Sequence, residues 1–322
     1  MTSLLPLNRN LDVVYGDVVS VSPRIRRVVA KNPSRFTFKG TGTYLVGHGD
    51  VAVIDPGPAL DEHADAILAA LGPGERITHV VVTHTHSDHS PGCRLLRDRG
   101  VDAPTFGFGP HGQVPPDDPS DRVIFGDPDA DGRDEKPAGQ ELREGADTEF
   151  RPDITMSSGD VLVGAGWTLR AVHTPGHTSN HLCFALPEEK VLFSGDHVMG
   201  WSTSVIGPPD GNLNEYLASL RLLLRRNDQF YWPTHGPRID DPHTLVQSFI
   251  NHRNERTAQL LAELSNGPRT LADIVPRLYA DVDKKLWPAA AASMYAHALA
   301  LVETGQIRAD AQARRTSSYT LA

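Results

Sequence analysis

The stretch "VVVTHTHSDHSPG", Val80 to Gly92, places three histidines and one aspartate within six consecutive residues, one threonine after a run of three valines. The β-branched run predicts a buried strand that ends at the first histidine. His84 and His86 lie two residues apart on extended chain, so their imidazoles point to the same side. Asp88 and His89 follow in the turn before a predicted helix. Imidazole nitrogen and carboxylate oxygen together suit zinc or a similar divalent metal.

Three further β-like runs end at a residue of a type that binds metals. His177 follows a strand and a Pro-Gly turn in "HTPGHTSNH", Asp196 follows a strand in "FSGDHV", and His235 precedes a Gly-Pro turn in "YWPTHGP". Because polar loops gather at the ends of strands, we expect all of these side chains to meet at one site.

Other polar residues near these motifs have alternative roles. Asp55 follows "VAVI" in "VIDPG", where its carboxylate could orient a ligand histidine or form a turn. His181, four residues past His177, could lie behind the ligands or contact a substrate. We do not expect His111 in "GFGPHG" to line the site.

Strands and helices alternate along the chain. Short β-like runs at residues 42–47, 51–57, 77–84, 169–177 and 190–196 are interleaved with helical patterns such as "LDEHADAILAAL" and "NLNEYLASLRLLLRR". This order predicts a layered α/β fold. Beyond residue 250, three helical patterns and an alternating segment follow, an order that resembles a winged helix. We therefore expect two domains, residues 1–250 and 251–322.

The net charge of −9 is concentrated in one segment. Residues 117–153 hold five basic and thirteen acidic side chains, a net charge of −8, and their Gly, Pro and Asp content predicts a long solvated insertion. Residues 256–322 hold eight basic and six acidic side chains, and this net charge of +2 is weak for nucleic-acid binding. The sequence shows neither a leader pattern nor an apolar run near the roughly 18 residues of a membrane span. We expect a cytoplasmic protein without a membrane partner, and the oligomeric state stays unknown.

The motifs "VIDPG", "THTHSDH", "TPGHT", "SGD" and "THGP" together resemble the metallo-β-lactamase superfamily over about residues 20–250. The resemblance implies an αββα sandwich with two divalent metal ions at one edge. His84, His86 and His177 would hold one ion, Asp88, His89 and His235 the other, and Asp196 would bridge both. Zinc is the expected metal, with manganese and iron as alternatives. The tail is similar to that of superfamily hydrolases with a C-terminal winged helix, which include an animal endoribonuclease.

These features predict a dinuclear metal-dependent hydrolase that attacks its substrate with a metal-bridging hydroxide. Asp88, Asp55 and His181 are the candidate catalytic residues. The acidic insertion favours a small ester or thioester as substrate. Glyoxalase II, which hydrolyses a thioester, shares "THTHSDH" and "TPGHT" but has a different tail. Two alternatives stay open: an endoribonuclease acting on single-stranded RNA, and a non-catalytic nucleic-acid-binding protein with a vestigial metal site.

Overall fold

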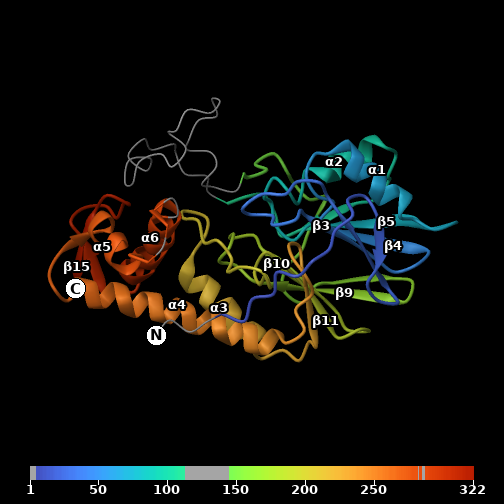
Figure 1. Ribbon diagram of the computed structural model, residues 1–322. Coiled ribbons are helices and arrows are strands. Elements are labelled where there is room, and N and C mark those ends of the chain that lie inside the picture. The colour runs from blue at the N-terminus through green and yellow to red at the C-terminus, as the bar shows by residue number, and fades with distance from the viewer. Residues whose placement is uncertain (1–4, 113–144, 282, 285–286) are drawn as a thin grey trace.

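The computed structural model describes residues 5–112, 145–281, 283–284 and 287–322. Two β-sheets pack face to face with helices on both outer faces, and a smaller domain follows at the C-terminal end (Figure 1). This is the predicted αββα sandwich. Residues 117–144 of the expected acidic insertion lie outside the described residues. Within the described ranges, no helix is long and apolar enough to cross a membrane.

The first sheet has seven strands in sequence order. They are β1 (Val18–Ser20), β2 (Ile25–Val29), β3 (Gly42–Val46), β4 (Asp50–Ile54), β5 (Arg76–Val81), β6 (Thr105–Gly107) and β7 (Ile154–Thr155). β1 to β4 pair antiparallel, whereas β4 to β7 pair parallel. β4 reads as a continuous apolar run because both of its faces are buried. The outer face of this sheet is covered by α1 (Asp61–Ala69) and α2 (Gly92–Asp98), through side chains such as Ile67 and Leu96.

The second sheet has five strands in the order β12-β11-β10-β9-β8. They are β8 (Val161–Gly164), β9 (Trp167–His173), β10 (Leu182–Leu186), β11 (Val191–Gly195) and β12 (Phe230–Pro233). Only β11 and β12 pair parallel among these strands. The two sheets share a core in which Tyr44 packs against the rings of Phe193 and Trp232. The outer face is covered by α3 (Leu213–Leu223) and α4 (Pro242–Leu264).

α4 runs from beneath the sandwich into the C-terminal domain (Figure 1). That domain contains α5 (Leu271–Leu278), α6 (Trp287–Glu303) and a small antiparallel sheet of β13 (Arg269–Thr270), β15 (Ser318–Leu321) and β14 (Ile307–Ala309). Helices followed by a two-stranded hairpin form the predicted winged helix. Ala296 and Ala300 of α6 belong to the same core as α3, so the domain packs on the sandwich. α4 is continuous through residue 250. The domain boundary expected at that residue stays a prediction.

Two pairs of parallel strands position the polar loops. β4 and β5 end together at one edge of the first sheet, and β11 and β12 end together at one edge of the second. The N–H of Gly42 donates to the carbonyl of Thr234 at 2.9 Å and joins the two sheets there. The loops that follow all four strands therefore meet at one edge of the sandwich.

Arg26 and Glu75 provide a test of the packing at the opposite edge of the first sheet, where β4 and β5 begin. The Arg26 guanidinium, on β2, donates to Glu75 Oε2 at 2.6 Å and to the carbonyls of Gly47 and Ala70. Burial raises the pKa of Glu75, but hydrogen bonds from Arg26 and from the backbone of Gly72 outweigh this effect and lower the pKa to about 2.

We expect Glu75→Gln to lower the free energy of unfolding at pH 7 by about 1 kcal/mol, since solvent screens part of this pair. Because the pKa of Glu75 is depressed in the folded state, its contribution to the free energy of unfolding is complete above its unfolded-state pKa near 4.5. That contribution is lost as the pH falls towards 2. Urea titrations of both proteins at pH 7 and pH 3 measure the difference. A difference in the free energy of unfolding that does not shrink at pH 3 would contradict a stabilising role for the ionised Glu75 carboxylate.

Candidate metal centre and cavity

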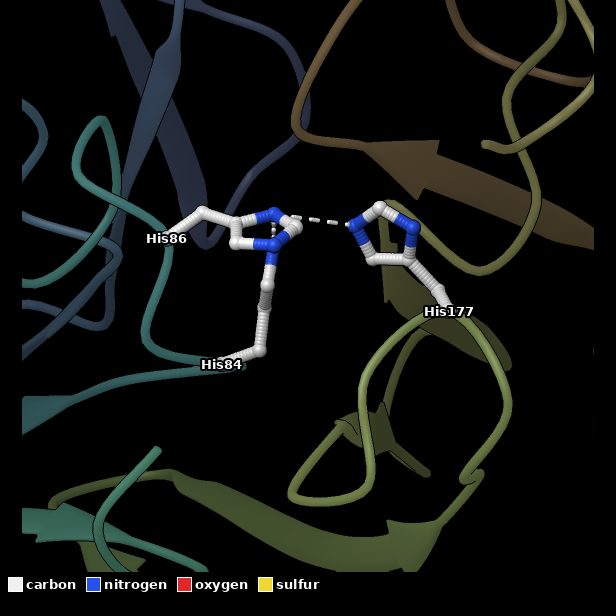
Figure 2. A group of neighbouring side chains, drawn as sticks. All are labelled: His84, His86 and His177. Atoms are coloured by element: carbon white, nitrogen blue, oxygen red, sulfur yellow. Dashed lines mark hydrogen bonds between the residues drawn. The ribbon is translucent and has the colours of Figure 1, made fainter. Parts of the chain in front are cut away.

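Three buried histidines converge at the edge where the strands end. His84 and His86 lie in the loop after β5, and His177 lies in the loop between β9 and β10. His86 Nδ1 lies 3.0 Å from His84 Nε2 and 3.1 Å from His177 Nε2, and the rings point toward one another (Figure 2). Burial, followed by the neighbouring histidines, lowers the pKa of both His84 and His86 well below the usual value. Neutral imidazoles with nitrogen lone pairs facing one point can bind a divalent cation.

A second group lies beside the first and contains carboxylates. His235 Nε2 lies 3.1 Å from Asp88 Oδ2 and 3.3 Å from Asp196 Oδ2, and His89 Nε2 lies 3.4 Å and 3.5 Å from the same two atoms. Asp196 Oδ2 also lies 4.0 Å from His177 Nε2 of the first group. The Asp196 carboxylate is therefore the acid that both groups share.

The electrostatics of the second group differ from those of the first. Burial lowers the pKa of His235, but Asp196 and Asp88 outweigh it and raise the pKa to about 10. Burial also lowers the pKa of His89, but Asp88, Asp196 and Asp55 raise it well above the usual value. Positive charge is thus stabilised here by several neighbouring carboxylates. A divalent cation would supply that charge directly.

Four of the five histidines are oriented through their second ring nitrogen. The Nδ1 atoms of His84, His89, His177 and His235 lie 3.0, 2.9, 2.6 and 3.2 Å from Thr83 Oγ1, Asp55 Oδ2, Val205 O and Gly40 O, respectively. An N–H donated from Nδ1 to an oxygen orients the ring, so that Nε2 faces the cluster as the atom that would bind a metal.

The unsatisfied atoms of the cluster fit a bound cation. Among the described residues, His89 Nε2 and Asp196 Oδ1 are buried and have no hydrogen-bond partner. Buried polar atoms without partners are costly in a folded protein. His84, His86 and His177 form one set whose donor atoms lie within 4.8 Å of one another, and Asp88, His89 and His235 form another. This set of imidazoles and carboxylates suits a divalent metal of the first transition row.

Asp55 lies behind the cluster. Its carboxylate accepts from Thr83 N and Oγ1, both at 2.8 Å, and from Thr234 Oγ1 at 2.9 Å, in addition to His89. These bonds hold a left-handed backbone (φ 51°), which costs a non-glycine residue roughly 1 kcal/mol. Asp55 therefore orients His89 and links the loops after β5 and β12.

His181 is completely buried and contacts protein on both sides of its ring. Its Nδ1 lies 2.9 Å from Thr174 Oγ1, and its Nε2 accepts the N–H of Asp196 at 3.2 Å. Gly195 has a φ of 53°, and a β-carbon there would lie 2.5 Å from His181 Nε2. His181 thus positions the Asp196 backbone, and of its two expected roles the structure favours the one behind the ligands.

Several residues of the site were missed in the sequence. Thr41 donates to Asp88 Oδ2 at 2.9 Å and accepts from Asn32 Nδ2 at the same distance. Arg27 donates to the carbonyls of Gly236 and Thr234, on either side of His235. The only available signals were a threonine between two glycines and an arginine inside an apolar strand, and neither indicates its partner.

A cavity of about 390 Å³ adjoins the first histidine group. His86 and His177 form part of its wall, and the opposite wall comes from α4 and α6. His111 also lines the cavity, with Nδ1 3.0 Å from Thr85 Oγ1, so our expectation for His111 is wrong. Asn180 holds this loop in place by donating to Thr85 Oγ1 and to the carbonyl of Pro110.

The end of the predicted insertion also borders the cavity. Ala146 is a lining residue and forms an isolated β-bridge with His86. The N–H of Ser87 donates to Gly145 O at 2.7 Å, and the N–H of Asp147 donates to Thr85 O at 2.8 Å. Residues 145–147 are therefore packed directly on the histidine-rich loop.

Comparisons with known proteins agree with this site. The sequence profile of the "Metallo-beta-lactamase superfamily" matches residues 37–235, and that of the "Beta-lactamase associated winged helix domain" matches residues 270–315. "Atrochrysone carboxyl ACP thioesterase dmxR1" of a Cryptosporiopsis species is 32% identical over 251 residues, which cover 77% of this chain and 65% of that protein. "Beta-lactamase-like protein 2 homolog" of Drosophila melanogaster is 29% identical over 313 residues, 90% of this chain and 92% of that protein.

The fold has a solved counterpart along nearly its whole length. A beta-lactamase domain protein from Burkholderia ambifaria superposes with a TM-score of 0.74 at 20% identity, covering 98% of this chain and 97% of that one. The match includes the winged helix as well as the sandwich, because it spans both. Because the superfamily profile matches more than half of its length, this chain belongs to the metallo-beta-lactamase superfamily of hydrolases, in the group that carries the associated winged helix.

Proposed function

We propose that this protein is a dinuclear metal-dependent hydrolase of a small ester or thioester. The observation that carries the proposal is the cavity of about 390 Å³ whose wall includes His86 and His177. A cavity of this size is within the range of small-molecule sites. A ligand bound there would have its reacting carbonyl beside the histidine cluster.

The ligand set of the proposal follows the two groups of side chains. His84, His86 and His177 would hold one ion, Asp88, His89 and His235 the other, and Asp196 would reach both. Two such ions, zinc by preference, would generate a nucleophile from water at neutral pH and stabilise the negative charge that develops on the substrate. We further place the protein in the cytoplasm.

The chain's own residues would preorganise this chemistry. Asp55 and Thr83 hold the rings of His89 and His84, so their lone pairs need not reorient when the substrate binds. Thr41 and His235 share Asp88 Oδ2, which keeps that carboxylate facing the cluster. His181 acts as a positioning residue through the backbone of Asp196.

A thioester fits the site better than RNA for two reasons. A thiol has a pKa near 8.5, so the thiolate leaves without a dedicated acid, whereas an alkoxide needs one. The cavity between the sandwich and α6 has the size of a small-molecule site, while an RNA strand needs an extended basic path. The relative named as an acyl-carrier-protein thioesterase is consistent with this substrate class.

Replacement of Asp88 tests the reaction and the substrate class together. The zinc-loaded protein should hydrolyse thioesters of pantetheine or glutathione and leave single-stranded RNA intact. Asp88→Ala removes a proposed metal ligand and should reduce turnover by more than about 100-fold, because loss of a residue that only orients a ligand already costs up to about 100-fold. His243→Ala, which removes an exposed histidine that contacts the carbonyl of Arg226 and does not line the cavity, is the control and should retain activity. RNA cleavage that Asp88→Ala abolishes, without thioester turnover, would replace this proposal with the endoribonuclease.

Asp55→Asn tests the orienting role of the carboxylate behind the cluster. The amide keeps the size of the side chain but cannot match all the donors that surround Asp55, so the ring of His89 loses its fixed tautomer. We expect metal affinity, measured by competition with a chelating dye, to fall by about 10-fold to 100-fold. Asp17→Asn, at an exposed position, is the matched control. Equal affinities of the two variants would show that Asp55 is only a turn residue.

A further inference from the structure

We propose that the part of the cavity between the two domains binds an anionic group of the substrate, a carboxylate or a phosphate, through Arg253. This inference rests on the proposed function and defines the substrate class of the same site. It gives the C-terminal domain a role in recognition, in addition to covering the cavity.

Arg253 is a buried cation without an anionic partner. It lies on α4, lines the cavity and is 6% exposed. Among the described residues no carboxylate lies within ion-pair distance of its guanidinium. Its Nη2 donates to Ser204 O at 2.6 Å and its Nη1 to Ser293 Oγ at 3.4 Å. A guanidinium carries five N–H donors, so these bonds leave others available. A buried charge is costly unless it is paired, and a bound anion would pair it.

The one carboxylate that lines the described part of the cavity does not pair with Arg253. Arg35 and Arg315 also line the cavity but have interactions of their own, and Asp210 is the one carboxylate among the lining residues of the described chain. Asp210 already accepts from Ser179 N at 3.0 Å and from Ser179 Oγ at 2.6 Å. Arginine suits carboxylates and phosphates because its forked donors can bind two oxygens at once.

One short segment connects the two ends of the cavity. The carbonyl of Ser204 accepts from Arg253, and the carbonyl of the next residue, Val205, binds His177 Nδ1. Both residues line the cavity. The guanidinium and the histidine cluster are therefore held at a fixed separation before any ligand binds. Preorganisation of this kind converts recognition of a remote group into correct placement of the reacting bond.

The wall supplied by α6 leaves space for such a ligand. Ala289, Ala292 and Ser293 line the cavity at spacings of three and four residues, so they share one face of the helix. Their small side chains fill little of the volume beside Arg253. The anion could belong to the acyl part of a thioester, as a terminal carboxylate, or to the thiol part, as a phosphate.

Three matched compounds separate these sources. Pentanoyl-pantetheine is neutral, glutaryl-pantetheine carries a carboxylate on the acyl side, and pentanoyl-4′-phosphopantetheine carries a phosphate on the thiol side. Binding is measured by calorimetry with inert thioether analogues, in which a methylene replaces the scissile carbonyl, and turnover is measured with the thioesters. We expect one anionic analogue to bind the zinc-loaded protein about 10-fold to 100-fold more tightly than the neutral one, the range for a hydrogen-bonded charge.

Arg253→Gln should reduce this ratio to near one, whereas Arg256→Gln should preserve it. Arg256 is a suitable control because it lies on the same helix but bonds to Gln259 and does not line the cavity. Should the glutamine variant fail to fold, Ser293→Asp places a carboxylate beside the guanidinium and should abolish the preference in the same way.

Equal binding of all three analogues to the wild-type protein would overturn the proposal. A preference that persists in folded Arg253→Gln, or in Ser293→Asp, would also overturn it and leave Arg253 as a structural link between domains. Anion-dependent binding without turnover of any thioester would support the recognition site and contradict the proposed hydrolase activity, so the two failures can be told apart.

Discussion

The structure depends on burying five imidazoles and two carboxylates of the cluster within one small volume. His84, His89, Asp196 and His235 are all at most 1% exposed, far from the solvent that would normally stabilise their polar atoms. Such a cluster is unfavourable unless its members are oriented and its charge is compensated. The protein supplies the orientation through hydrogen bonds to the outer nitrogens of the histidine rings. The remaining inward donor atoms then define where a cation is stabilised.

The fold brings together residues that are far apart in the sequence. Two pairs of parallel strands, β4 with β5 and β11 with β12, end at the same edge of the sandwich, and each end delivers one of the polar loops. Asp55 bonds to residues of two of these loops, Thr83 and Thr234, and therefore connects the two sheets beneath the cluster. The winged helix then closes the cavity from the side, which gives one site contributions from both domains.

The sequence was informative wherever a side chain itself carried the signal. A strand is followed within three residues by histidine or aspartate at His84, Asp196 and His235, so these side chains are expected near the ends of strands. The expected sandwich and winged helix followed from the same periodicities and from the family resemblance. The structure brings all seven expected ligands into one cluster.

Contacts made by backbone atoms could not be predicted in this way. The carbonyls of Gly40 and Val205 orient two histidines, yet a carbonyl is present in every residue and leaves no trace in the sequence. The position of His111 was predicted wrongly because it depends on how Asn180 holds a distant loop. The cavity was not predictable either, since it forms between elements that pack only in three dimensions.

The most direct test of this account is a crystal structure of the zinc-loaded protein with anomalous scattering measured on both sides of the zinc absorption edge. We predict two zinc peaks, one bonded to His84, His86 and His177 and the other to Asp88, His89 and His235, with Asp196 bonded to both. A single peak, or zinc bound only outside the cluster, would contradict the dinuclear site on which the proposed hydrolysis depends.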